Sequence, residues 1–309
     1  MSSGLVIKNT GSWYYVEDSA EGEVITCKIK GKFRLKDVRT TNPITVGDFV
    51  DYETDDAGSH LITRVLDRKN YIIRRSSNLS REAHIIAANL DMAFVVATLD
   101  YPKTSFEFID RFLVTAEAYN VPAVIILNKS DIYGEEYRDE LDYFLYTYQT
   151  AGYEIIEVSA TEDFNIDRLK ELTIGKTTLF SGNSGVGKSS LIKAIDPSLN
   201  PKTGEISAYH KKGKHTTTFS EMYPLAEGGY IIDTPGIKGF GLVEFDKNEI
   251  SRFFPEIFRY SPDCQYYNCT HVHEPGCAVI KAVQEGQISD SRYISYLKLL
   301  EDDNDKYRK

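Results

Sequence analysis

The sequence lacks any apolar run close to the roughly 18 residues that a membrane-spanning helix needs, which argues against an integral membrane protein. Its first ten residues lack the basic stretch and apolar core of a secretory signal. Cysteine is scarce, with only four in 309 residues, so a disulfide-rich secreted domain is disfavoured. We therefore expect a cytoplasmic protein with no membrane partner, in which metal binding by cysteines competes well against disulfides.

A basic surplus is also missing, because the formal net charge is −10. This charge disfavours nucleic-acid binding by the surface as a whole. The acidic surplus falls within residues 76–250, whereas acidic and basic residues nearly balance before and after that segment. A local basic surface outside the segment is therefore still compatible with the sequence.

Short strands separated by Gly- and Asp-containing breaks fill the first 75 residues, at 11–16, 24–35, 48–52 and 60–65. Strands of this length predict a small β-barrel. Five basic side chains alternate along the second of these strands and share one face, with apolar residues on the other. We interpret this face as a strip that contacts RNA phosphates, although a plain solvated strand face has the same pattern. The strip consists of Lys28, Lys30, Lys32, Arg34 and Lys36.

From about residue 76 the pattern changes to apolar runs that alternate with helical segments. The apolar runs at 92–99, 121–127, 154–158, 178–180 and 230–232 predict strands. Helical spacing between them predicts a parallel sheet covered by helices on both faces. After about residue 245 we expect helices, interrupted by a cluster of Cys and His residues.

A glycine-rich sequence, G-N-S-G-V-G-K-S, follows the predicted strand at 178–180 and opens a helix. It matches the G-x-x-x-x-G-K-[ST] phosphate-binding loop in the strand–loop–helix context that this motif requires. The loop N–H groups favour bound phosphate, Lys188 adds a positive charge, and the Ser189 hydroxyl can bind Mg²⁺. An ordinary glycine-rich turn is the alternative, and a chance match is rare. The predicted nucleotide-binding residues here are Gly182, Asn183, Ser184, Gly185, Val186, Gly187, Lys188, Ser189 and Ser190.

A second motif, N-K-S-D, follows the apolar run at 121–127 and consists of Asn128, Lys129, Ser130 and Asp131. The Asp131 carboxylate can accept hydrogen bonds from both N1–H and N2–H of guanine. Adenine lacks this donor pair, so the motif predicts GTP rather than ATP. Asn128 suits the N7 and O6 side of the base, and the Lys129 stem can lie along the base plane.

Two further segments follow predicted strands. Ser159 and Ala160 offer a backbone N–H to guanine O6, with a plain loop as the alternative. The D-T-P-G sequence at 233–236 places Asp233 to hold Mg²⁺ through water and the Gly236 N–H to contact the γ-phosphate, with a simple strand-to-turn corner as the alternative.

The order of these motifs is circularly permuted. Most Ras-like GTPases run phosphate loop, switch I, D-x-x-G, N-K-x-D and S-A, whereas this chain places N-K-S-D and S-A first. The same sheet can still form, because strands that are neighbours in space need not keep their chain order. The segment after D-T-P-G runs directly into the C-terminal region, so we expect loss of the γ-phosphate to move that region.

Between the phosphate loop and D-T-P-G lies G-K-H-T-T-T at 213–218. A threonine here can bind Mg²⁺ when GTP is bound, and a solvated basic loop is the alternative. Position 237 is an isoleucine, which cannot orient water as glutamine does in many GTPases. His215 is the nearest candidate in sequence for that role, with a structural histidine as the alternative. We therefore expect slow hydrolysis without a partner.

Three of the four cysteines fall within 14 residues, in the pattern C-x₄-C-x-H-x₅-C. Zn²⁺ takes four such ligands tetrahedrally, and four protein ligands make the site structural. His273 is an alternative fourth ligand, and loop cysteines without a metal are the alternative to a zinc site. Cys27 stands apart, and we interpret it as a small apolar side chain. The predicted zinc ligands are Cys264, Cys269, His271 and Cys277.

With these motifs the chain resembles the ribosome small-subunit-dependent GTPase A family of circularly permuted bacterial GTPases over nearly its whole length. The resemblance rests on N-K-S-D, G-N-S-G-V-G-K-S, G-K-H-T-T-T, D-T-P-G and the Cys/His cluster ending in E-P-G-C. It implies late maturation of the small ribosomal subunit, with hydrolysis stimulated by that subunit, and an OB-fold and a zinc domain flanking the GTPase. It also implies Thr217 as the switch I threonine that binds magnesium and His215 as a catalytic histidine, beside Lys188.

We therefore predict a multidomain α/β protein with an OB-fold RNA-binding barrel at 1–75, a circularly permuted P-loop GTPase domain at 76–245 and a helical zinc-binding domain at 246–309. The predicted monomer binds GTP with magnesium, holds one structural zinc, and hydrolyses GTP to GDP and phosphate on the small ribosomal subunit and its rRNA. One alternative is a permuted GTPase of the large subunit, which the zinc cluster and N-terminal β segment disfavour. The other is an RNA-binding module whose nucleotide only stabilises the fold, which the intact Lys188, Ser189 and Asp233 argue against.

Overall fold

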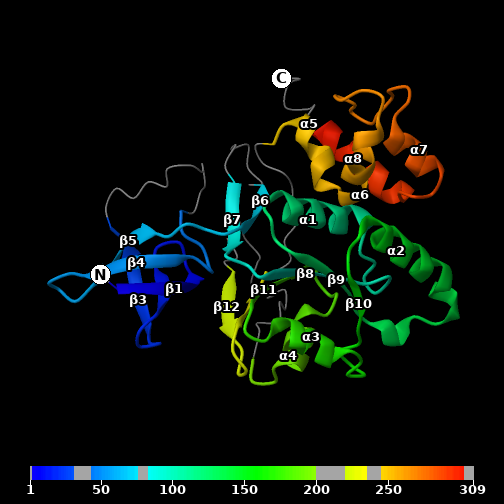
Figure 1. The fold of residues 1–309 in the computed structure, drawn as a ribbon. Helices are drawn as coiled ribbons and strands as arrows, with labels where there is room; N and C mark the ends of the chain where they lie inside the picture. The colour runs from blue at the N-terminus through cyan, green and yellow to red at the C-terminus, as the bar shows by residue number, and fades with distance from the viewer. Residues whose placement is uncertain (1, 31–42, 76–82, 200–219, 235–244, 303–309) are drawn as a thin grey trace, which may run out of the picture.

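The N-terminal strands close into a barrel (Figure 1). The computed structural model describes residues 2–30, 43–75, 83–199, 220–234 and 245–302. Around the barrel the strands run β1, β2, β3, β5, β4, and β4 pairs back onto β1. This five-stranded closure is the OB-fold arrangement. The strands are β1 (Ser2–Asn9), β2 (Tyr14–Asp18), β3 (Val24–Ile29), β4 (Phe49–Thr54) and β5 (His60–Val65).

The barrel interior is apolar, because alternate residues of each strand point inward. Val6, Val16, Cys27, Val50 and Ile62 are fully buried there. Cys27 therefore packs as a small apolar side chain, which confirms its interpretation from the sequence.

In the barrel one predicted strand needs correction and one strand was not predicted. The strand expected at 11–16 begins only at Tyr14, since Gly11 takes a φ of 87° in the preceding turn. The strand β1 was not predicted, because S-S-G-L-V-I-K-N has a short apolar run rather than an alternation. The strand expected at 24–35 is present as far as Ile29, and residues 31–42 lie outside the described part.

Six further strands form a sheet in the order β10-β9-β8-β11-β13-β12, and all of them except β12 run parallel. The strand before the phosphate loop, β11, lies between β8 and β13 although it follows β8 by about 80 residues in the chain. This confirms the predicted permuted sheet. The strands are β8 (Met92–Ala97), β9 (Ala123–Leu127), β10 (Ile155–Glu157), β11 (Thr177–Gly182), β12 (Glu221–Pro224) and β13 (Tyr230–Asp233).

Helices cover both faces of this sheet, as predicted (Figure 1). Alternate strand residues such as Ile125 and Leu179 pack with α1 and α2, while Ile126 and Phe180 pack with α3 and α4. Two separate cores result, one on each face. The helices are α1 (Phe106–Ala118), α2 (Arg138–Ala151), α3 (Ile166–Thr173) and α4 (Lys188–Ile195).

A hairpin lies between the barrel and the sheet and was not predicted. Its strands, β6 (Tyr71–Arg75) and β7 (Ala83–Ala88), pair only with each other among the described strands. Ile72 and Ile86 join the core that holds α1, and the ring centroids of Tyr71 and Tyr119 lie 4.8 Å apart. The hairpin is thereby attached to the helix layer.

The barrel and the sheet are also joined edge to edge. Strand β1 pairs with β12 at Lys8 and Glu221, whose side chains form a 2.7 Å ion pair. The Tyr230 hydroxyl of β13 donates to the Glu17 carboxylate of β2 at 2.8 Å. Two strands of the six-stranded sheet are therefore in contact with the barrel.

The C-terminal region is helical, as expected, and packs beside α1 (Figure 1). Its helices are α5 (Lys247–Ile250), α6 (Pro255–Tyr260), α7 (Ala278–Gln284) and α8 (Asp290–Asp302). Short 3₁₀ turns are η1 (Ser130–Ile132), η2 (Glu135–Tyr137), η3 (Ser251–Phe253) and η4 (Ser261–Asp263). Among the described residues, no helix combines the length and apolar character needed to cross a membrane.

A buried ionic network joins this region to helix α1, which covers the six-stranded sheet. Arg292 of α8 is fully buried, and its guanidinium lies 2.8 Å from Asp110 Oδ1 of α1 and 2.7 Å from Glu256 Oε1 of α6. The Ser295 hydroxyl donates to the other Asp110 oxygen at 2.5 Å. Burial raises the pKa of Asp110, and the Arg292 charge opposes that shift. The charges are therefore tolerated only as a set.

We predict that Arg292→Met lowers the free energy of unfolding by about 3–5 kcal/mol, because it leaves two buried carboxylates without their cation. Lys298→Met on the same helix is the control, since its ion pair with Glu107 is half exposed and contributes about 0–1 kcal/mol. Chemical denaturation of the two variants measures the difference. Equal losses in the two variants would contradict this account of the network.

Candidate functional site

The phosphate loop connects β11 to α4, as the sequence predicted. Lys188 is the first residue of α4, and its ammonium group donates to the carbonyls of Gly182 at 2.7 Å and Asn183 at 3.1 Å. Burial lowers the pKa of Lys188, and the nearby Asp233 carboxylate opposes this shift. The lysine therefore lies folded over its own loop, with its charge directed at the space that the loop encloses.

Two glycines of the loop are required by close backbone approach. Gly182 has a φ of 156°, and a Cβ there would lie 2.5 Å from the Val96 carbonyl oxygen of the neighbouring strand. Gly187 has a φ of 95°, and a Cβ there would collide with the Asn128 side-chain amide. Both positions combine a left-handed backbone with a lack of space, which only glycine satisfies.

The base-reading motif meets the phosphate loop at Asn128. This residue is buried at the end of β9, and its Nδ2 donates to the Val186 carbonyl at 2.8 Å. Its backbone N–H donates to the Ala97 carbonyl at 2.9 Å. Two motifs that lie 58 residues apart in the chain are therefore in direct contact.

Asp131 is held by the segment that follows β10. The Ser159 hydroxyl donates to Asp131 Oδ1 at 2.5 Å and thereby lowers the pKa of the carboxyl group. The N–H of Ser130 donates to the Val158 carbonyl at 3.1 Å. The predicted base-reading residues of the two segments thus lie side by side, and Asp131 is exposed and ionised at neutral pH.

The other two residues of these segments are placed by backbone geometry. Lys129 adopts a left-handed φ of 67°, and its ammonium group donates to the Tyr101 carbonyl. The Ser159 N–H donates to the Phe164 carbonyl at 3.2 Å, so of the pair Ser159 and Ala160 only Ala160 keeps a backbone donor for a base.

Asp233 ends β13 beside the phosphate loop. It pairs in register with Phe180 of β11, and its Oδ1 is buried without a hydrogen-bond partner among the described residues. Burial raises the pKa of this carboxyl, and the Lys188 charge opposes the shift. Ser189 is the second residue of α4, directly after Lys188. An unpartnered buried carboxylate oxygen at the end of β13, in register with the strand that leads into the phosphate loop, suits a hydrated Mg²⁺.

Several predicted residues lie outside the described part of the chain. These are His215, Thr217, Gly236 and Ile237 of the nucleotide site and Lys32, Arg34 and Lys36 of the basic strip. Their predicted roles stay predictions.

The described end of the basic strip is exposed, as expected. Lys30 forms a 2.6 Å ion pair with Glu53, whereas the Lys28 ammonium lies 4.2 Å from the centre of the Trp13 ring. Trp13 is 42% exposed and was not predicted as part of this face. The sequence has a single tryptophan, and it lies in the predicted barrel. This could have identified Trp13 as a candidate contact residue.

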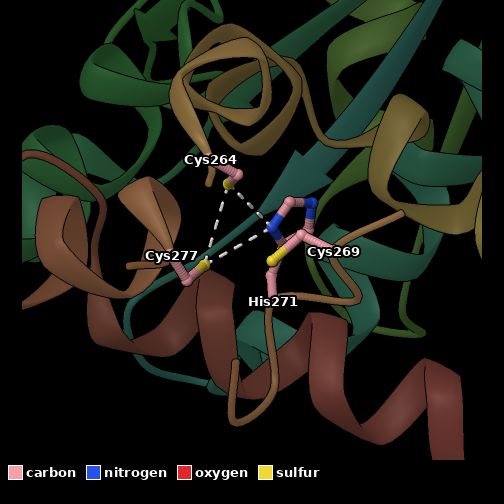
Figure 2. Close-up of side chains that lie close together, drawn as sticks. All are labelled: Cys264, Cys269, His271 and Cys277. Atoms are coloured by element: carbon pink, nitrogen blue, oxygen red, sulfur yellow. Dashed lines mark hydrogen bonds between the residues drawn. The ribbon is translucent and has the colours of Figure 1, made fainter. Parts of the chain in front are cut away.

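The four predicted metal ligands come together in the C-terminal region (Figure 2). Their ligand atoms all lie within 4.8 Å of one another, with His271 Nδ1 at 3.6 Å from Cys264 Sγ and 3.5 Å from Cys277 Sγ. The Sγ atoms of Cys264 and Cys277 are 3.9 Å apart. A tetrahedral zinc site requires about 3.8 Å between two thiolates, so the set fits a zinc ion. His273 is exposed and outside this cluster, which leaves His271 as the histidine of the group.

Neighbouring groups hold the ligand loop in place. His271 Nε2 lies 3.1 Å from the Ser261 hydroxyl, which fixes the ring so that Nδ1 faces the thiols. Burial acts to raise the pKa of Glu274, but hydrogen bonds to its carboxylate outweigh burial and lower that pKa. The donors include the Thr270 hydroxyl at 2.5 Å, the Thr270 N–H at 2.7 Å and the Val272 N–H at 3.0 Å. Burial raises the pKa of the Cys269 thiol, so a thiolate there requires a cation.

Two family models match the chain. The model described as RsgA GTPase matches residues 65–243, and the model described as RsgA N-terminal domain matches residues 3–62.

Relatives and solved structures match the chain over nearly its full length. Proteins named small ribosomal subunit biogenesis GTPase RsgA from Phocaeicola vulgatus and Bacteroides fragilis are 57% and 56% identical over 306 residues, which is 99% of this chain and 98% of theirs. The crystal structure of YjeQ from Thermotoga maritima is 34% identical, covers 97% of this chain and 98% of its own, and has a TM-score of 0.75. YloQ, described as a circularly permuted GTPase, is 29% identical with a TM-score of 0.73 and covers 100% and 97%.

We predict that Gly187→Ala lowers the free energy of unfolding of the nucleotide-free protein by more than Gly228→Ala does. Both positions have similar positive φ values, so each substitution costs about 1 kcal/mol in backbone strain. At Gly228 the added Cβ meets open space, whereas at Gly187 it meets Asn128, which adds about 1–3 kcal/mol. Chemical denaturation measures both, and equal losses would show that the loop and Asn128 are not tightly packed.

Proposed function

The chain belongs to the RsgA family of GTPases, and from that premise we propose that it hydrolyses GTP to GDP and phosphate in the maturation of the small ribosomal subunit. The main support for a single nucleotide site is the hydrogen bond from Asn128 Nδ2 to the Val186 carbonyl. It sets the base-reading residues and the phosphate loop at a fixed separation, so that one guanine nucleotide can reach both.

In the proposed complex Asp131 accepts from N1–H and N2–H of guanine, and the Ala160 N–H donates to O6. The Lys129 stem lies along the base plane. These contacts use atoms that are left available by the bonds described above. The remaining nucleotide-binding residues of the proposal are Asn128, Ser130, Ser159 and the loop from Gly182 to Ser190.

The phosphates bind in the loop between β11 and α4. Lys188 exchanges its bonds to the Gly182 and Asn183 carbonyls for the β- and γ-phosphate oxygens. Magnesium neutralises charge on these oxygens when it is bound, and Ser189, Thr217 and, through water, Asp233 would hold it. The Gly236 N–H senses the γ-phosphate. His215 orients the attacking water, a role that the side chain of Ile237 cannot fill.

We also propose one zinc ion bound by Cys264, Cys269, His271 and Cys277, as their mutual distances support. Four protein ligands leave no open position, so the ion would stabilise the C-terminal region rather than take part in hydrolysis.

The domain arrangement of the proposal has an RNA-binding barrel at 1–75, the GTPase domain at 76–245 and the zinc domain at 246–309. The barrel contacts rRNA phosphates through Lys28 and the rest of the basic strip. The protein acts as a monomer in the cytoplasm, where it binds and leaves the small subunit.

We predict slow phosphate release from GTP by the purified protein and an increase of about tenfold or more when small ribosomal subunits are added. Large subunits are the control. A nucleotide that stays bound without turnover, with or without small subunits, would instead support a purely structural nucleotide.

Asp131→Asn should lose GTP turnover and gain xanthosine triphosphate turnover, because the new amide N–H₂ can donate to the xanthine carbonyl at position 2.

We predict about one zinc per chain in the purified protein, measured by elemental mass spectrometry after dialysis against a mild chelator. Cys277→Ala should lose most of the metal, because three ligands bind zinc far more weakly than four. Cys27→Ala is the matched control and should keep it, since Cys27 lies in the barrel core. A full zinc content in Cys277→Ala would contradict the assignment of Cys277 as a zinc ligand.

A further inference from the structure

Tyr133 connects the two ends of the base-reading motif. It follows the turn η1, which contains Asp131, and its hydroxyl donates to the Asn128 carbonyl at 2.7 Å. The same hydroxyl accepts from the Leu99 N–H at 2.9 Å. One side chain therefore closes the loop 128–133 on itself and attaches it to the segment that leaves β8.

The hydroxyl can fill both roles at neutral pH. Burial raises the pKa of Tyr133 to about 12, so its proton is retained and can be donated to Asn128. A phenolic oxygen also has acceptor capacity for the Leu99 N–H. The ring packs against the core formed with α1 and α2, and its centroid lies 5.5 Å from that of the Tyr137 ring. The bridging oxygen is thus held by a fixed ring.

Two further bonds join the same pair of segments. The Tyr137 hydroxyl donates to Asp100 Oδ2 at 2.8 Å, and the Lys129 ammonium donates to the Tyr101 carbonyl. The segment after β8 also lies close to the phosphate loop, because a Cβ built on Gly185 would be 3.4 Å from Pro102 Cδ. The segment that Tyr133 bonds to is therefore itself a neighbour of the phosphate loop.

We propose that Tyr133 is a positioning residue for guanine recognition. Its hydroxyl holds Asn128 by the carbonyl and holds the turn that carries Asp131 against the end of β8. It makes no contact with the nucleotide itself. The inference rests on the proposed nucleotide site, and it adds that selectivity for the guanine 2-amino group depends on a tyrosine outside the N-K-S-D motif.

A phenylalanine at this position keeps the ring and removes the bridge. The Leu99 N–H and the Asn128 carbonyl then lose their shared partner, and the loop 128–133 is free to shift relative to β8. Inosine diphosphate lacks the 2-amino group and so forfeits one of the two hydrogen bonds to Asp131. The ratio of GDP to inosine diphosphate affinity therefore reports how well Asp131 is aligned.

The test compares wild type, Tyr133→Phe and Tyr146→Phe in the full chain, with both nucleotides titrated by calorimetry. Tyr146 is the matched control, because its hydroxyl also donates to a backbone carbonyl, that of Gly286 at 2.8 Å, away from the nucleotide site. We expect Tyr133→Phe to weaken GDP binding by about threefold to tenfold and inosine diphosphate binding by less. Tyr146→Phe should leave both affinities unchanged.

Unfolding of the same nucleotide-free samples is measured alongside. An unchanged GDP affinity in Tyr133→Phe overturns the inference, and so does an equal loss for both nucleotides, which would show only a general loss of folded protein. If the wild type binds neither nucleotide, the proposed nucleotide site is wrong. If the wild type binds GDP and Tyr133→Phe binds it equally well, only the inference about Tyr133 is wrong.

Discussion

The parallel pairing of β11 between β8 and β13 is the constraint on which the site depends. In a parallel sheet the carboxyl ends of neighbouring strands meet at one edge, and ligands bind there. That edge collects the phosphate loop after β11, Asp233 at the end of β13 and Leu99 after β8. Strand β9 adds Asn128 beside them. The order of these segments in the chain has no effect on their assembly, because register and strand neighbours alone bring them together.

The permuted order does decide what else the sheet touches. The Tyr230 hydroxyl of β13, the strand that ends in Asp233, donates a hydrogen bond to Glu17 of the barrel. Glu221 of the neighbouring strand β12 forms an ion pair with Lys8 of β1. On one face of the sheet, α1 presents Asp110 to the buried Arg292 of the C-terminal region. Both flanking regions therefore contact elements of the GTPase domain directly. A shift of β13 when the γ-phosphate leaves would change contacts at the barrel without any intervening linker.

Features encoded within a few residues could be predicted from the sequence, whereas those that need distant partners could not. The phosphate loop, N-K-S-D and the Cys/His cluster each have their chemistry and spacing in one short stretch, and the predicted sheet follows from periodicity. Arg292 lies in a largely polar helix and reads as a surface residue, because its partners are 36 and 182 positions away. Tyr133 was missed for the same reason. Its ring reads as core, and only the folded chain brings its hydroxyl to Leu99.

Asn128 links the loop proposed to recognise the base to the loop proposed to bind the phosphates. Its N–H bonds to β8, its side chain bonds to the phosphate loop and its carbonyl accepts from Tyr133. Three segments thus fix one buried residue, so a displacement of any of them also moves the other two. The Asn128 Oδ1 atom has no partner among the residues that the structure describes. A polar atom left unsatisfied at this depth is costly, and a ligand or water that bonds to it would gain from a cost that folding has already incurred.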